Sequence, residues 1–310
     1  MTQYILRRLF FILITLLAVT ALSYGLIFAA GDPAMMLAPH KPGMDPNPEV
    51  VEAVRKRYNL DKPLPIQYLS YLAQLAQGEL GDSYYFRRPV RELLFEKFPN
   101  TLLLAALIMG VAMLIGLPLG MVAAIYRNTI IDRIIITFCT LTIALPSFFL
   151  ALLFIYFVAF RMRLLPITGY GTPAHLVLPV LSVAVPMAAG YILFLRSNVL
   201  NQTSSEYART ARAKGLLARV VAVRHILPNA LIPVVTMAGL DLAYLLTGVV
   251  LVESVFNYPG IGLQVLTAVT NLDVPVVMGS VLMASLLVGF GNLIADLIVA
   301  RLDPRIRLGG

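Results

Sequence analysis

The apolar residues of this chain fall in six long runs, separated by shorter polar or charged segments. A bilayer core about 30 Å thick is crossed by roughly 20 apolar residues in a helix. Five of the runs contain no charged residue, and the sixth is interrupted by one acid, Asp241. The pattern predicts an all-α membrane protein with six transmembrane helices, at Leu9–Ala30, Phe98–Tyr126, Ile134–Phe160, Leu176–Leu195, Ile226–Val252 and Val274–Ala295.

The segment between the first two predicted helices is too long to be an ordinary loop. Within it, Glu49–Tyr58 and Ile66–Gln77 carry apolar residues at the spacing of amphipathic helices. We therefore expect small helices in this segment. The chain then divides into residues 1–30, residues 31–98 and a main transmembrane domain at residues 99–310.

Composition supports the membrane class. Of the 310 residues, 59% are hydrophobic and 13% are charged, whereas about 25% of the residues of a soluble domain are charged. The mean hydropathy is +0.84. The net charge of +8 could indicate nucleic-acid binding, but residues 31–97 carry equal numbers of acidic and basic side chains. The excess of Lys and Arg lies at the N-terminus, in alternate loops and in the tail, at Arg7, Arg8, Arg127, Arg133, Arg196, Arg209, Arg212, Lys214, Arg219, Arg224, Arg301, Arg305 and Arg307.

This alternation of basic loops predicts an orientation in the membrane. Short loops rich in Lys and Arg stay in the cytoplasm, whereas the loop Ser254–Asp273 contains neither residue. Long segments such as residues 31–98 cross regardless of their charge. We expect both termini and the loop at residues 196–227 in the cytoplasm, and residues 31–98 outside.

The first apolar run has a second interpretation. Arg7 and Arg8, an apolar stretch and Ala29-Ala30-Gly31 resemble a secretory signal with its cleavage site. The apolar core of such a signal is usually about 7–15 residues. The run Leu9–Ala30 is longer, and we therefore expect a retained membrane helix. The single cysteine, Cys139, falls in the third predicted helix, so no disulfide can form within the chain.

The loop between the fourth and fifth predicted helices has the signals of a well-defined helix. Thr203 and Glu206 have the spacing of a capping box, in which each side chain bonds the backbone N–H of the other residue. Arg212 and Lys214 follow near the far end, where the helix dipole favours cations. Gly215 can then supply a left-handed stop. The segment predicts a polar helix of about three turns.

Ala208 and Ala211 lie three residues apart on one face of this helix, which a partner's surface could approach closely. The residues alone leave two interpretations open. The helix could lie on anionic lipid headgroups, or it could fit a groove of a cytoplasmic partner and transmit force.

A family resemblance distinguishes between these interpretations. The ten residues Glu206–Gly215, together with His225-Ile226-Leu227-Pro228-Asn229, resemble the EAA loop of ABC importer permeases. More narrowly, the chain resembles the first permease of the dipeptide, oligopeptide and nickel family. Further family-like stretches follow in the same order along nearly the whole chain, at Gly31-Asp32-Pro33, Leu60–Leu64, Gly78–Gly81, Pro89-Val90, Leu165-Pro166, Glu253–Gly262, Asp273–Val276 and Asp303–Arg307.

The resemblance implies a working assembly in the bacterial cytoplasmic (inner) membrane. Such a permease pairs with a homologous second permease, two ATPase subunits bind the pair inside, and a substrate-binding protein docks outside. The EAA helix would be the coupling helix, with Glu206, Tyr207, Ala208, Ala211, Lys214 and Gly215 as its ATPase-coupling residues. ATP and Mg would be bound by the partner ATPases, and no cofactor by this chain, which has no Gly-x-x-x-x-Gly-Lys-Ser/Thr loop. The solute stays open among peptides, nickel chelates, glutathione and others, with peptide as the first choice.

Asp241 departs from the family pattern, in which an uncharged polar residue is expected at this place. A carboxylate near the middle of a span costs roughly 2.5–3.5 kcal/mol on insertion scales, and intramembrane acids usually face a cavity or a partner. Asp241 is either protonated or paired between helices, or it faces the translocation path together with Tyr244. In the second case we expect it to favour solutes with a cationic group.

Two rival functions are disfavoured by the residues. An aspartyl intramembrane protease needs two membrane carboxylates, whereas Gly289-Phe290-Gly291-Asn292 has an amide at the expected acid. The histidines His40, His175 and His225 lack the spacing of a metal site, and the motif of a membrane serine protease is absent. A transporter or channel that works without ATPases would not need an EAA-type loop.

Overall fold

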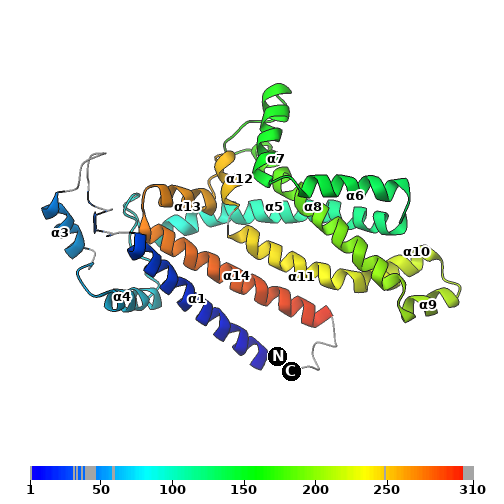
Figure 1. The fold of residues 1–310 in the computed structure, drawn as a ribbon, viewed down its shortest axis with the longest axis horizontal. Coiled ribbons are helices and arrows are strands. Elements are labelled where there is room, and N and C mark those ends of the chain that lie inside the picture. Colours follow the sequence, from blue (N-terminus) through cyan, green and yellow to red (C-terminus); the bar gives the residue numbers. More distant parts are fainter. Residues whose placement is uncertain are drawn as a thin grey trace. The chain divides into compact units, whose positions relative to one another are not determined.

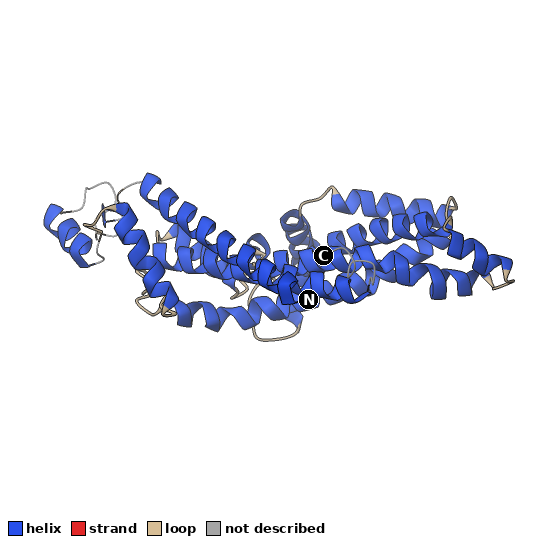
Figure 2. Ribbon diagram, turned by 90° about the horizontal axis from the view of Figure 1, so that it is seen from below, coloured by secondary structure: helices blue, strands red, loops and turns tan. Residues whose placement is uncertain are grey.

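The computed structural model describes residues 2–30, 32, 34, 35, 38, 47–57, 60–247 and 249–302. Of the positions discussed above, Gly31, Pro33, His40, Tyr58 and Asp303–Arg307 lie outside the described residues. Within the described residues no β-strand forms, and an isolated bridge joins Asp82 to Pro89 (Figure 2). The helices are α1 (Thr2–Ala30), α3 (Pro48–Arg57), α4 (Leu64–Ala76), α5 (Val90–Ile125), α6 (Ile130–Ile143), α7 (Ser147–Phe154), the π-helix η1 (Ile155–Arg161), α8 (Ala174–Thr203), α9 (Glu206–Ala213), α10 (Ala218–Val220), the π-helix η2 (Val221–Ile226), α11 (Leu227–Leu246), α12 (Val250–Val255), α13 (Ile261–Thr270) and α14 (Val274–Leu302) (Figure 1).

The chain forms two compact units, which are described separately below. The first comprises Met1–Pro99 with Gly260–Leu287, and the second comprises Asn100–Pro259 with Val288–Gly310. Helices α5 and α14 each run from one unit into the other.

The all-helical prediction and most of the predicted membrane helices are confirmed. Among the described residues five helices are long and apolar enough to cross a bilayer, at Leu6–Gly25, Val90–Ile125, Ala174–Thr203, Ala218–Leu246 and Val274–Ile294. The chain therefore has five candidate spans, or six if the bent helix pair in the remaining run counts as one.

The run Ile134–Phe160, predicted as one transmembrane helix, does not form one continuous helix. The run consists of Ile130–Ile143 and Ser147–Arg161, which meet at an angle of 99° (Figure 1). Pro146 explains the break, because it has no backbone N–H and disfavours helical geometry at the residue before it. The proline has extended backbone, with φ −60° and ψ 142°, and the chain begins a new helix directly after it.

The predicted cytoplasmic loop at residues 196–227 is largely helical, because the neighbouring helices extend into it. Helix α8 continues to Thr203, and the helix that includes α11 already begins at Ala218. Counting apolar residues measures the part of a helix that lies in the bilayer, and the charged ends of these two helices extend beyond that part. The non-helical links are reduced to two short stretches on either side of α9.

Helices α3 and α4 of the first unit confirm the two amphipathic helices predicted after the first span. Helix α4 is tied to α1 by side-chain hydrogen bonds. Tyr24 donates to Gln67 Oε1 over 3.0 Å, and the hydroxyls of Thr20 and Tyr68 lie 3.0 Å apart. Gln67 is nearly buried, and its amide also donates to the carbonyl of Lys62 over 2.6 Å. These bonds explain how a polar face of α4 can lie against an apolar helix.

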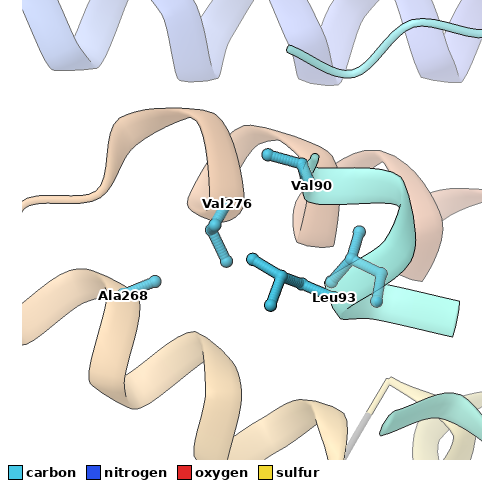
Figure 3. Close-up of a cluster of buried hydrophobic side chains, with 5 residues drawn as sticks. Val90, Leu93, Ala268 and Val276 are labelled. Atoms are coloured by element: carbon cyan, nitrogen blue, oxygen red, sulfur yellow. The ribbon is translucent and has the colours of Figure 1, made fainter. Parts of the chain in front are cut away.

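The start of α5 forms a small core with α13 and α14, which Figure 3 shows. Val90, Leu93, Ala268 and Val276 point toward one another there and are nearly or fully buried. Asp273, which is fully buried, directly precedes α14 beside this core. Its carboxylate accepts hydrogen bonds from the Ser83 hydroxyl and from the backbone N–H groups of the two residues that follow Ser83. One acid thus joins the segment before α5 to the start of the last helix.

Candidate functional site

Helix α9 begins differently from the predicted capping box. Its N-cap is Ser205, and no side chain caps its first N–H groups. Thr203 is the last residue of α8, where its hydroxyl donates to the carbonyl of Val199 over 2.8 Å. The longer α8 therefore uses Thr203 for its own end. Glu206 is highly exposed and pairs only with Arg209, three residues along its own helix, among the described residues.

The predicted left-handed stop at Gly215 is confirmed, with φ +75°. The N–H of Gly215 donates to the carbonyl of Arg212 over 2.9 Å, and the N–H of Leu216 donates to the carbonyl of Ala211 over 3.4 Å. These two bonds form a Schellman motif, which satisfies carbonyls that a helix end otherwise leaves without partners. Helix α9 therefore ends at a defined residue.

The small face of α9 is occupied by the chain itself, which corrects the expectation that a partner approaches it. Ala208 is fully buried and Ala211 is 5% exposed. Helix α9 packs here against η2 and α8 of the same unit (Figure 1). The exposed surface of α9 and its C-cap is mostly polar or basic, and comprises Glu206, Tyr207, Arg209, Thr210, Arg212, Ala213 and Lys214. Two exposed leucines, Leu216 and Leu217, follow it.

An ion pair with a buried carboxylate fixes α8 to α6. Arg196 Nε donates to Asp132 Oδ1, and Arg196 Nη2 donates to Asp132 Oδ2, both over 2.7 Å. The Asp132 side chain is 3% exposed, and it also accepts the backbone N–H of Asn128 over 2.8 Å. Asp132 was not among the residues predicted from the sequence. Both residues of the ion pair lie at the edges of apolar runs, but no spacing in the sequence indicates that they pair.

Asp241 lies between helices and is partly exposed. The hydroxyl of Tyr191 on α8 donates to Asp241 Oδ2 over 2.7 Å. Tyr191 itself is fully buried. Tyr244, which was predicted beside Asp241, is 65% exposed and lies one turn further along α11. The structure therefore joins Asp241 to Tyr191, a residue that the sequence reading did not single out.

Helices α5 and α8 approach closely at two glycines. A Cβ added at Gly116 would lie 2.8 Å from the Tyr191 Cβ, and one added at Gly120 would lie 3.0 Å from the carbonyl oxygen of Ile192. The spacing Gly116-x-x-x-Gly120 is typical of close helix packing in membranes. This packing holds the ring of Tyr191 in place beside α11.

The family-like stretch Glu253–Gly262 takes part in a polar cluster at the start of the second unit. Tyr258 donates to the carbonyl of Asn100, and Asn100 donates to the carbonyl of Pro259. Tyr170 donates to Asn100 Oδ1, and the Thr101 hydroxyl donates to the buried Glu253 carboxylate. Burial, with Tyr170 and Glu253 nearby, raises the pKa of Tyr258 to about 12. Tyr258 therefore acts as a neutral hydrogen-bond donor.

Two family descriptions together match nearly the whole chain. Residues 116–308 match the binding-protein-dependent transport system inner membrane component. Residues 1–105 match the N-terminal part of a binding-protein-dependent transport system membrane component.

Relatives of full length point to the same family. The glutathione transport system permease protein GsiC of Salmonella choleraesuis is 37% identical over 308 residues, which cover 99% of each chain. A protein described as a peptide permease of Brucella suis biovar 1 is 38% identical and is covered over its full length by 99% of this chain.

A solved structure of the MetNI methionine ABC transporter, in an inward-facing conformation, matches with a TM-score of 0.54 and 20% identity. It covers 69% of this chain and 97% of that chain. The likeness shows a shared fold. The chain thus belongs to the family of binding-protein-dependent transport system inner membrane components, as a permease subunit of an ABC importer.

Proposed function

We propose that this subunit imports peptides or closely related small solutes, and that α9 is the helix through which partner ATPases drive it. The observation that carries the proposal is the construction of α9. Its alanine face packs against η2 and α8 of its own chain, and its polar face is exposed. A helix that is packed against its own chain on one face and exposed on the other can bind a partner and transmit the partner's movement to α8 and η2.

Contacts at both ends of α9 support this role. Its start is tied to α8 by Tyr207, whose hydroxyl donates to Gln202 Oε1 over 2.8 Å. Its end is tied to the same helix by Arg212, which donates to the carbonyl of Thr203 over 3.0 Å. Movement of α9 would therefore carry the end of α8 with it, and through η2 it would reach α11.

The partners proposed for this assembly follow from the family. They are a second permease, two ATPase subunits that bind ATP and Mg, and an extracytoplasmic binding protein. The exposed basic residues of α9 suit an acidic groove on an ATPase, since opposite charges speed and orient docking. Membrane lipid surrounds the remaining apolar surface, and we expect neither catalysis nor nucleic-acid binding by this chain.

Peptide import is favoured by the names of the relatives. The Salmonella protein is named for glutathione transport, and the Brucella protein is described as a peptide permease. Glutathione is itself a small peptide, so both names indicate a short peptide backbone.

The proposed orientation places both termini, α9 and its links in the cytoplasm, with six crossings. Cysteines at the exposed Gln77 and Ser204, each in a Cys139→Ala chain, test it. In intact cells an impermeant thiol reagent should label position 77 and spare position 204. Equal labelling would rule out this orientation.

The coupling role is tested by Gly215→Val. A β-branched side chain scarcely adopts a left-handed backbone, which costs about 1–2 kcal/mol, and nothing lies within 4 Å to clash with it. The variant should assemble, but it should transport slowly and lose the stimulation of ATP hydrolysis by the loaded binding protein.

Gly78 provides a matched control. It has φ +79°, open space around it and the same pair of Schellman hydrogen bonds, at the end of α4. Gly78→Val should carry the same local strain and still transport normally. Full transport by Gly215→Val, or equal losses in both variants, would contradict the coupling role.

A further inference from the structure

Asp241 is an acid within a membrane-spanning helix, and its known partner is a hydroxyl. Tyr191 donates to Asp241 Oδ2 over 2.7 Å. In the part of the chain that the structure describes, no ion pair reaches Asp241 and no hydrogen bond to its Oδ1 is present. One carboxylate oxygen is thus held, and the other is available.

The hydroxyl that holds Asp241 is firmly positioned. Tyr191 is fully buried, and its Cβ lies against Gly116 of α5. Its hydroxyl also lies 3.4 Å from the sulfur of Met109. A rigid donor on α8 therefore fixes the direction of a carboxylate on α11.

Asp241 lies at the edge of the exposed surface of α11. The buried stripe of that helix contains Val234, Ala238 and Leu245, and its exposed stripe contains Leu240 at 55% and Tyr244 at 65% exposure. Asp241 lies between the stripes and is partly exposed. A carboxylate facing lipid is strongly disfavoured, whereas one facing a water-filled cavity or a charged partner is not. The edge marked by Asp241 therefore faces something polar.

We propose that Asp241, oriented by Tyr191, forms a subsite of the translocation path that recognises the ammonium group of a solute. This inference rests on the proposed import function and names the class of substrate at its path. Oδ2 remains on Tyr191 while Oδ1 accepts a hydrogen bond from the passing ammonium. A single partly hydrated carboxylate binds weakly enough to release the solute, which conduction requires.

The test uses the assembled transporter in sealed membrane vesicles of both orientations, and it needs no knowledge of the natural solute. Single cysteines replace Leu240 or Tyr244 in a Cys139→Ala chain. Two impermeant methanethiosulfonate reagents of similar size are compared, one carrying a trimethylammonium group and one a sulfonate. The measured quantity is the ratio of their reaction rates.

Both cysteines should react, and Asp241→Asn should lower the ratio of cationic to anionic rates by about fivefold, as loss of a nearby unit charge in a wet site predicts. Tyr191→Phe should lower the ratio by a smaller factor, because it frees the carboxylate without removing it. A cysteine at Gln77, which is exposed outside the candidate spans, is the control. Its reactivity should not depend on Asp241.

Three outcomes would overturn the inference. They are failure of both cysteines to react, a rate ratio that Asp241→Asn leaves unchanged, or loss of the assembled complex in Asp241→Asn, which would make the acid a contact with another subunit. Asp241→Asn without any added cysteine gives a second measurement. It should slow uptake of a dipeptide with a free amino terminus in matched amounts of complex, and an undiminished rate would also contradict the proposal. If any of these results appears while Gly215→Val loses transport and Gly78→Val keeps it, the subsite is refuted and the proposed import function stands.

Discussion

The ion pair between Arg196 and Asp132 allows a quantitative prediction. Arg196→Gln removes two hydrogen bonds of 2.7 Å and leaves a carboxylate that is 3% exposed with the Asn128 N–H as its remaining described partner. Removing one partner of a buried pair costs about 3–5 kcal/mol, because the other charge stays buried without compensation. The lower value of about 3 kcal/mol applies here, because the arginine side chain is 20% exposed and water reaches it.

Cys139 makes this loss measurable. It is the single cysteine of the chain, it is fully buried, and it packs between α6 and α8 against Ala189 and Ile192. A small permeant maleimide reaches it only when the two helices separate locally, so the labelling rate reports the free energy of that opening. Since each 1.4 kcal/mol is a factor of ten, Arg196→Gln should speed labelling by about 100-fold.

Two further variants show whether the buried charge is the cause. Arg133→Gln removes the same charge from an exposed side chain next to Asp132 and should leave the labelling rate unchanged. Arg196→Gln combined with Asp132→Asn removes both charges and should bring the rate to within about tenfold of the natural chain. If Arg196→Gln labels as slowly as Arg133→Gln, or the double variant as fast as the single one, the reasoning is refuted.

Two other predictions concern packing and the ties outside the membrane core. Gly116→Ala should lower the thermal unfolding midpoint of the purified transporter, because overpacking against α8 costs about 1–3 kcal/mol. Gly110→Ala should leave the midpoint unchanged, because nothing lies within 4 Å of the added Cβ. Equal midpoints for the two variants would contradict the close packing of α5 against α8. Asp273→Ala should leave buried donors of the Ser83–Phe86 turn without an acceptor, at a cost of about 3 kcal/mol, and should speed limited proteolysis there, while the exposed Asp82→Ala should not; unchanged cleavage in Asp273→Ala would contradict the structural role of this acid.

The features that the sequence predicted are those set by local chemistry. Helix α8 contains an uninterrupted apolar run, α4 contains an amphipathic spacing, and Gly215 ends a polar helix. In each case the information lies within about 30 consecutive residues. The resemblance of Glu206–Gly215 to the EAA loop is local in the same sense.

The features that the sequence did not predict depend on residues far apart in the chain. Arg196 and Asp132 are 64 residues apart, and Tyr191 and Asp241 are 50 residues apart. No spacing rule joins such pairs, because the packing of whole helices brings them together. The capping box at Thr203 failed for a related reason, since a longer α8 competed for the same hydroxyl. The bend before Pro146 could have been predicted locally from the proline. One helix was predicted instead, because the whole run is apolar.

The bent pair of α6 and α7 also has a consequence for counting crossings. Helix α6 has 14 residues, so it is about 21 Å long and shorter than a bilayer core of about 30 Å. Asp132 lies in the first turn of α6 and Arg196 lies in the last third of α8, yet their side chains touch. The chain between them therefore starts and finishes at the same membrane face, which requires an even number of crossings. Helix α8 accounts for one, and parity favours the bent pair as the other. This parity supports the six crossings proposed above, which would place both termini on one side of the membrane.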